Sequence, residues 1–157
     1  MAVAQTDIAA MPAEPGAYAL HIVLPRRFEG AIGALGPVSL KRGDYLYLGS
    51  ARGPGGISSR VGRHCRPEKK IHWHIDHLTV AGRVTEAVAI PGGSECTLAE
   101  LALTFPGVTV PVPGFGSSDS KRCMSHLLLL PKPLCAAILD NIKASVRNSR
   151  EGTTSGR

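Results

Sequence analysis

The sequence contains no long hydrophobic run. Its longest apolar stretches, such as "HLLLLPKPL", are interrupted by proline well before the roughly 20 residues that a membrane-spanning helix needs. The first residues, "MAVAQTDIAAMPAEPG", have neither a basic start nor a continuous apolar core. We therefore expect no secretory signal and no association with a membrane. The chain also has no internal repeat.

Cysteine is scarce and scattered. The four cysteines, at positions 65, 96, 123 and 135, show no paired spacing. In a chain without a secretory signal we expect reduced thiols, several of them filling the core, and a cytoplasmic location. The glycine-rich stretch "GSARGPGG" is not followed by Gly-Lys-Ser/Thr, which excludes a Walker-type phosphate-binding loop.

Length and composition are those of one folded domain. The chain has 157 residues, of which 43% are hydrophobic and 19% are charged. Residues 1–14 and 148–157 are polar or small and show no periodic pattern. We expect them to be a mobile leader and a disordered tail on either side of a single domain at 15–147.

The positive charge is concentrated in one segment. Eight basic residues lie between positions 41 and 70: Lys41, Arg42, Arg52, Arg60, Arg63, Arg66, Lys69 and Lys70. Asp44 and Glu68 oppose them, so this window carries +6, whereas the rest of the chain has ten basic and ten acidic residues. Such a local basic field favours a partner that bears phosphate groups; a chance cluster on a solvated surface is the alternative.

Short strands alternate with helices along the chain. Apolar and β-prone residues predict strands at 16–24, 44–50, 83–90 and 125–130, with a possible hairpin extension within 26–43. Helical spacing predicts helices at 57–66, 94–105 and 133–146, although Gly62 weakens the first of these. Residues 69–80, "KKIHWHIDHLTV", fit either a helix or a strand. The pattern indicates an α+β domain with a small sheet flanked by helices.

Several of these elements carry polar side chains suited to phosphodiester cleavage. The candidates are Tyr18, Tyr47, Arg60, His64 and a later acid, Glu95 or Glu100. Tyr18 and Tyr47 can share one face if their strands pair, and Arg60 and His64 project from the same side of a helix. A phenol or an imidazole can take a proton from water, an arginine can stabilise a charged phosphate, and a carboxylate can anchor a divalent ion.

The order of these motifs resembles the GIY-YIG nucleases. Gly16-Ala17-Tyr18 stands in the place of the GIY element, and Tyr47-Leu48-Gly49 stands in the place of YIG. "ISSR" resembles the start of the helix that carries the family's arginine, and "ECTLAELAL" resembles the helix that supplies its glutamate. Four longer segments, "YLYLGSA", "KKIHWHIDHL", "SECTLAE" and "FGSSDSKRCMSHL", are similar to a subgroup labelled DUF123. The similarity covers residues 15–131.

This resemblance implies a small, about three-stranded, mixed or antiparallel sheet flanked by helices and a metal-assisted endonuclease that acts on DNA. Tyr47 or Tyr18 would assist deprotonation of the attacking water, and Arg60 would stabilise the pentacovalent phosphate. His64 matches a histidine that some members carry, and Glu95, or alternatively Glu100, would hold Mg²⁺ or Mn²⁺. The alternatives are a nucleic-acid-binding module without turnover and an RNA-processing nuclease. Because no separate DNA-binding domain is evident, a partner protein or structure-selective recognition would supply specificity.

We expect a basic surface beside the site to bind the nucleic acid. Its candidate contacts are Arg52, Arg63, Arg66, Lys69, Lys70, His72 and His74. For the "HWHIDH" cluster we favour a structural element with Trp73 in the core over a metal site. Asp119 and His126 are expected to make structural hydrogen bonds. In the subgroup's later Ser-Asp-Cys-x-Cys loop, Ser120 replaces the first cysteine before Cys123, so we expect no zinc site there.

Overall fold

Four antiparallel strands form the central sheet of the computed structural model, which describes residues 11–116 and 124–155, with side chains of the last helix described to residue 145. Their order is β5-β1-β4-β6, built from β1 (Gly16–Leu24), β4 (Gly43–Ala51), β5 (Arg83–Pro91) and β6 (Leu127–Leu130). Strands β2 (Phe28–Ala31) and β3 (Pro37–Leu40) form a separate hairpin. All six strands lie in segments predicted as strands or as a hairpin. The sheet has one strand more than the resemblance implied, because β6 pairs with β4.

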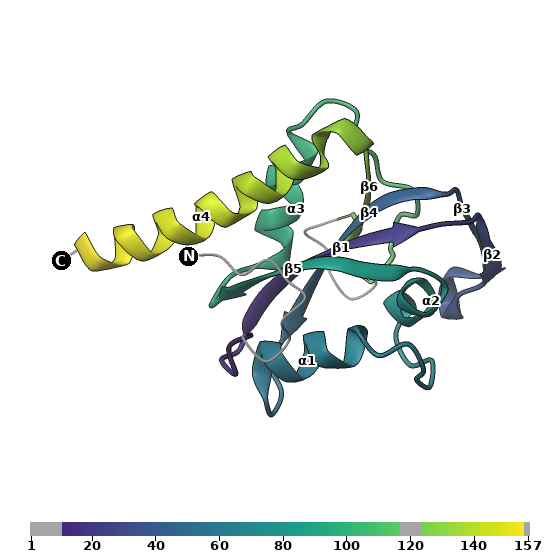
Figure 1. Cartoon of the computed structure of the whole chain (residues 1–157), viewed down its shortest axis with the longest axis horizontal. Coiled ribbons are helices and arrows are strands. Elements are labelled where there is room, and N and C mark those ends of the chain that lie inside the picture. The colour runs from purple at the N-terminus through teal and green to yellow at the C-terminus, as the bar shows by residue number, and fades with distance from the viewer. Residues whose placement is uncertain (1–10, 117–123, 156–157) are drawn as a thin grey trace.

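Helices cover both faces of this sheet. Helices α1 (Gly56–His64) and α2 (His74–Ala81) lie on one side, and α3 (Glu95–Leu103) and α4 (Cys135–Ser155) lie on the other (Figure 1). Two 3₁₀ turns, at Gly33–Leu35 and Lys132–Leu134, complete the regular structure within the described residues. The chain therefore has an α+β fold, and the ambiguous segment at 69–80 becomes a helix from His74 onward.

The strands divide their side chains between two cores, as period-two alternation requires. Tyr18 and Leu20 of β1 join Tyr45 and Tyr47 of β4 in the core beneath α1 and α2. The intervening residues face α3 and α4; they include Ala17, Ala19, Leu46 and Leu48. Strand β4 therefore has a tyrosine face and a leucine face.

The N-terminal boundary of the folded domain lies earlier than predicted. Met11 is buried in the core beneath α1 and α2. The backbone carbonyls of Pro12 and Glu14 accept hydrogen bonds from the N–H groups of Ser58 and Ile57 at 2.8 and 3.0 Å. The predicted mobile leader is therefore wrong for residues 11–14, because a helix start needs acceptors for its free N–H groups and this segment supplies them. Residues 1–10 lie outside the described residues.

The last helix is longer than predicted. Helix α4 runs to Ser155, whereas the sequence predicted a helix to residue 146 and a disordered tail from residue 148. Residues 135–151 contain neither proline nor glycine, so the backbone meets no strong helix breaker there.

The cysteines differ in state. Cys65 and Cys135 are free thiols, as predicted, but Cys96 is disulfide-bonded, so the prediction of reduced cysteines throughout is wrong. Scattered spacing along the chain does not reveal which cysteines the fold brings within bonding distance. Within the described part of the chain, no helix combines the length and the apolar character needed to cross a membrane.

Candidate active site

A pocket of about 340 Å³ opens on the side of the sheet that α1 and α2 cover. It is lined by Tyr18, Tyr47, Ser50, Arg60, His64, His72, Trp73, His74, Glu95, Gly116 and His126. Seven of these residues were predicted as site residues from the sequence. Among the acids that the structure describes, Glu95 lines the pocket, whereas Glu100 is exposed elsewhere on α3. The structure thus brings two strands, the ends of three helices and two loops to one place.

Tyr18 and His64 form a buried pair at the base of this pocket. The Tyr18 hydroxyl lies 2.6 Å from Nε2 of His64, and both side chains are about 1% exposed. Burial, together with the nearby Lys69 charge, lowers the pKa of His64 to about 3, so the imidazole is neutral at pH 7. Its Nδ1 has no hydrogen-bond partner among the described residues. The pair therefore presents a neutral imidazole whose nitrogen is hydrogen-bonded to a phenol hydroxyl.

Gly49 allows the Tyr18 ring to occupy this position. The two residues are direct cross-strand partners in the β1–β4 register. A Cβ atom on Gly49 would overlap the Tyr18 ring and hydroxyl. Only glycine lets a neighbouring group approach a strand backbone so closely, which explains why a glycine follows Tyr47-Leu48.

Tyr47 lies beside this pair on the same face. Its ring centroid is 6.4 Å from that of Tyr18 and 6.0 Å from that of His64. Burial raises the pKa of Tyr47 to about 12; the Arg60 charge opposes the rise and the Glu95 charge adds to it. Burial also raises the pKa of Tyr18 well above its usual value. Both phenols are therefore protonated at neutral pH.

Arg60 extends over the pocket from α1. Its Nη1 donates a hydrogen bond of 3.0 Å to the carbonyl of Ser50, and its guanidinium lies 4.4 Å from the centre of the Trp73 ring. A guanidinium over an indole face is held by a cation–π attraction. These two contacts leave donors of Arg60 available to an anion, since a guanidinium has five N–H groups.

Arg63 and Lys69, by contrast, support the scaffold. The Arg63 guanidinium donates two hydrogen bonds, of 2.7 and 2.9 Å, to the buried carboxylate of Asp76 and lies 4.3 Å from the Trp73 ring centre. Lys69 donates to the carbonyl of His64 at 2.7 Å and to the Thr79 hydroxyl at 2.9 Å. Because both head groups are engaged within the protein, this arrangement does not support their predicted role as nucleic-acid contacts.

Asp76 is the centre of that scaffold. Burial alone would raise the pKa of Asp76, but hydrogen bonds from Arg63 and from the amides of Trp73 and His72 bring it to about 2. The two hydrogen bonds from these backbone amides are both 2.8 Å long, and they fix the start of α2. This result supports the structural interpretation of "HWHIDH", except that Trp73 is half-buried and lines the pocket wall.

The histidines around the rim have different surroundings. His72 is exposed, whereas His74 is half-buried and its Nδ1 accepts a 3.0 Å hydrogen bond from the amide of Gly116. Both line the pocket, as their predicted contact role requires. His126 also lines it and was assigned only structural hydrogen bonds from sequence. The signal that could have identified it is its position at the point where a polar loop meets a buried strand.

The start of α1 is not an anion-binding site. A glycine-rich loop that leads into a helix can present free backbone amides to a phosphate. The amides of Ile57 and Ser58 are instead bonded to the carbonyls of the 12–14 segment. A Cβ on Gly56 would overlap the carbonyl of Ala13, so this glycine is needed for the close approach of the two segments.

Glu95 is placed by the first turn of α3. Ser94 caps this helix by accepting a 3.4 Å hydrogen bond from the amide of Thr97. The next residue, Glu95, is half-exposed and faces the pocket. One accessible carboxylate beside an open cavity fits Mg²⁺ or Mn²⁺, since Mg²⁺ takes one or two carboxylates and completes its shell with water and substrate phosphate.

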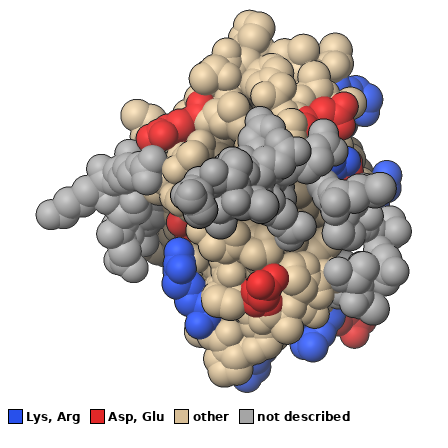
Figure 2. Space-filling view, turned by 90° about the vertical axis from the view of Figure 1, so that its left-hand side faces the viewer, with Lys and Arg blue, Asp and Glu red and all other residues tan. Residues whose placement is uncertain are grey.

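The exposed basic residues are candidates for outer contacts. Arg52, Arg66 and Lys70 are exposed around α1 and the loop that follows it. On the face shown in Figure 2, acidic and basic residues are interspersed among the coloured atoms, so no single continuous basic patch covers that view. Three loop residues that the sequence analysis discussed lie outside the described residues: Asp119, Ser120 and Cys123.

Comparison with known proteins gives one match. Residues 17–147 match the family model described as "Domain of unknown function DUF123". No curated protein and no solved structure matches the chain.

Proposed function

The chain belongs to the DUF123 family, and we propose that it is a divalent-metal-dependent endonuclease of the GIY-YIG type that hydrolyses nucleic-acid phosphodiester bonds, with DNA the expected substrate. One observation carries the proposal. Two phenols, a neutral imidazole, an arginine and a carboxylate from separate segments line one pocket. A proton acceptor, a phosphate-binding cation and a metal ligand are the groups that this reaction needs.

The proton path starts at the Tyr18–His64 pair. With the proton on Nδ1, Nε2 of His64 accepts the hydrogen bond of the Tyr18 hydroxyl, which lies 2.6 Å away. The Tyr18 oxygen can receive a proton from water as it passes its own to His64. Tyr47, which is 9% exposed, would orient that water through its hydroxyl.

Arg60 stabilises the charge that develops on the phosphate. Its guanidinium is oriented in advance by the Ser50 carbonyl and the Trp73 ring, so little reorganisation is needed during the reaction. Glu95 would hold the divalent ion, which supplies Lewis-acid polarisation of the phosphoryl oxygen. Arg52, Arg66 and Lys70 would contact the backbone farther from the scissile bond. The proposal includes a cytoplasmic location and a partner protein that supplies specificity.

A nucleic-acid-binding module without turnover is the second candidate. The observation that favours it is the protonated state of both phenols, because a general base works best with a pKa near the operating pH. Under this alternative the same pocket would bind a phosphate group and leave it intact.

Nicking of a supercoiled plasmid separates the two candidates. The endonuclease should convert the plasmid to open circles in Mg²⁺ or Mn²⁺ and should be inactive in EDTA. Glu95→Gln should abolish nicking, whereas Glu100→Gln, on the same helix but exposed elsewhere, should retain it. Tyr47→Phe should likewise be inactive, while Tyr45→Phe, whose hydroxyl donates to the Lys41 carbonyl, should be active.

Binding measured in parallel identifies the module. If plasmid is retained by the wild-type protein without any nicking, the binding module replaces the endonuclease. Retention should weaken steeply with salt, because phosphate contacts release counterions. A single-stranded RNA substrate that is cut while DNA is not would assign the site to RNA processing.

A further inference from the structure

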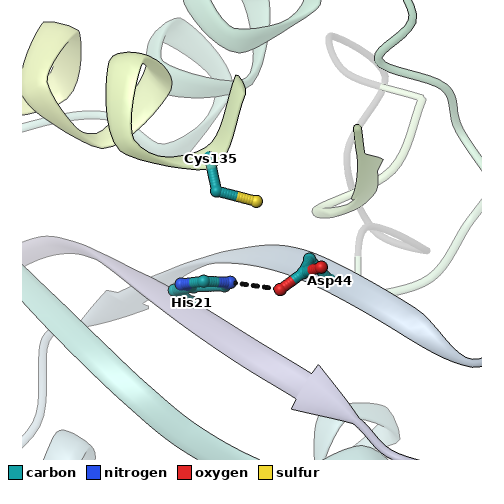
Figure 3. Close-up of side chains that lie close together, drawn as sticks. All are labelled: His21, Asp44 and Cys135. Atoms are coloured by element: carbon teal, nitrogen blue, oxygen red, sulfur yellow. Dashed lines mark hydrogen bonds and ion pairs between the residues drawn. The ribbon is translucent and has the colours of Figure 1, made fainter. Parts of the chain in front are cut away.

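A second cluster of reactive side chains lies on the opposite face of the sheet. His21 of β1, Asp44 of β4 and Cys135 at the start of α4 converge there (Figure 3). An imidazole nitrogen of His21, a carboxylate oxygen of Asp44 and Sγ of Cys135 all lie within 4.8 Å of one another. Nε2 of His21 is 2.9 Å from Oδ1 of Asp44. All three side chains are largely buried, and none takes part in the proposed nuclease chemistry.

Register and helix position create this cluster. His21 is paired with Leu46, and Asp44 is paired with Val23, so the two polar side chains are diagonal neighbours on one face. They belong to the face that carries the apolar core beneath α3 and α4. Cys135, the first residue of α4, closes over them from above the sheet.

Apolar packing does not explain why these three groups meet here. The Asp44 side chain is 8% exposed, and Lys132 Nζ lies 3.9 Å from its Oδ2, but the Lys132 side chain is 84% exposed. A buried anion is stable only when it is well compensated, so this site has room for a further positive charge.

This arrangement suits a bound cation better than a cysteine nucleophile. Activated cysteine nucleophiles lie in electropositive, partly exposed surroundings, whereas Cys135 is 7% exposed and its sulfur lies beside the Asp44 carboxylate. A thiol hydrogen bond of 3.6 Å to the Pro131 carbonyl holds the sulfur in place. A metal ion in the cluster would displace the thiol proton to solvent and leave a coordinated thiolate.

We propose that His21, Asp44 and Cys135 form a zinc-type metal site, separate from the pocket of Glu95. One nitrogen, one oxygen and one sulfur donor are the set that Zn²⁺ accepts, whereas Mg²⁺ takes oxygen ligands. In a tetrahedral zinc site the ligand atoms are about 3.3–3.7 Å apart. The His21–Asp44 separation of 2.9 Å would therefore lengthen slightly, and any separation near the 4.8 Å limit would shorten by about 1 Å. Water, or Glu86 from the same cavity of about 310 Å³, would complete the coordination.

The position of the site suggests what it does. It joins the first turn of α4 to the two central strands β1 and β4. Glu86 of β5 is already bonded to Lys143 of α4 at 2.6 Å, so a second attachment near the start of the helix would fix α4 at two points. The site is therefore structural, and its ion should raise thermal stability.

Titration with Co²⁺ tests the proposal directly, because a cobalt–thiolate bond gives a charge-transfer band in the near ultraviolet. The full-length protein is titrated without reductant, so that the Cys96 disulfide stays intact. We expect one equivalent to bind with this band, and Zn²⁺ to displace it. Cys135→Ser should lose the band, and Asp44→Asn or His21→Gln should weaken binding by at least about tenfold.

Cys65→Ser is the matched control, since Cys65 is the other free thiol among the described residues. It should keep the band, and so should Glu95→Gln, which separates this site from the proposed nuclease metal. Absence of a band in the wild-type protein, its retention in Cys135→Ser, or its loss in Cys65→Ser would overturn the proposal. If Cys135→Ser fails to fold, the melting temperature decides instead: Zn²⁺ must raise it in wild type but not in Asp44→Asn.

Discussion

The two faces of the central sheet are built from alternate residues of the same strands, yet they differ in chemistry. The face beneath α1 and α2 carries Tyr18 and Tyr47, which meet His64 and Arg60 in an open pocket. The face beneath α3 and α4 carries Ala17, Ala19, Leu46 and Leu48, which pack against apolar helix residues.

This difference indicates a division of roles. Small and aliphatic residues on the second face let two helices pack closely, so that face stabilises the fold. Aromatic rings on the first face hold polar groups at fixed separations, so that face positions the chemistry. The account therefore predicts that substitutions on the two faces affect different measurements.

The largest effect on stability is expected from Leu48→Ala on the second face. Leu48 is fully buried, and its truncation should lower the free energy of unfolding by about 2 to 5 kcal/mol, since the cavity is only partly refilled. Nicking by the remaining folded protein should keep its wild-type rate. Urea unfolding and plasmid assays on the same sample check both statements; a loss of specific activity in the folded fraction would contradict the division.

Arg60→Ala on the first face should give the converse result. Loss of one preorganised charge-stabilising group typically costs about 3 kcal/mol in the transition state, or a hundredfold or more in rate. Single-turnover nicking rates measure this change, and circular dichroism should remain unchanged. Arg83→Ala, an exposed arginine at the first position of β5 and outside the pocket lining, is the control and should remain active. An Arg60→Ala variant with the wild-type rate would remove Arg60 from the mechanism.

Gly49→Ala should affect both measurements, because this glycine lies at the junction of strand and site. The added methyl group would overlap the Tyr18 ring, so overpacking should lower the free energy of unfolding by about 2 kcal/mol and displace Tyr18 from His64. Gly53→Ala is the matched control, since no atom lies within 4 Å of a Cβ built there. Equal stability and equal nicking for the two variants would show that Tyr18 does not depend on Gly49.

The smallest expected effect is a pH dependence in the scaffold around Asp76. The folded pKa of Asp76, about 2, is below its ordinary value of 3.8, so its stabilising contribution is complete above about pH 4 and is lost as the pH falls toward 2. This contribution amounts to about 2 kcal/mol. The stability difference between wild type and Asp76→Asn, measured by urea unfolding, should therefore shrink over that range. A constant difference would contradict a paired carboxylate.

The sequence predicted the strands better than the contacts of the polar side chains. Alternation of Tyr45 and Tyr47 with leucine fixes which residues share a face, because the side-chain period of a strand is two. Helix ends were less certain: no breaker marks the end of α4, so its extension to Ser155 was missed. The role of residues 11–14 depends on a tertiary contact with the start of α1, which periodicity cannot reveal.

The candidate site shows the same limit. Residue type and order singled out Tyr18, Tyr47 and Arg60, which line the pocket, and left Glu95 and Glu100 as alternatives, of which Glu95 lines it. Charge alone could not distinguish Arg60, which faces the pocket, from Arg63. The guanidinium of Arg63 is bonded to the buried carboxylate of Asp76, which lies beyond the end of α1 in the sequence. The cluster of His21, Asp44 and Cys135 was also missed, because its members are far apart in the sequence and only strand register brings them together.

The most direct test of the central claim is a crystal structure of the protein soaked with Mn²⁺, with the ion located by its anomalous scattering. The account predicts a manganese peak beside the Glu95 carboxylate, on the side that faces Tyr47 and Arg60. A pocket without manganese at saturating concentration, or an ion bound to Glu100 instead, would contradict it.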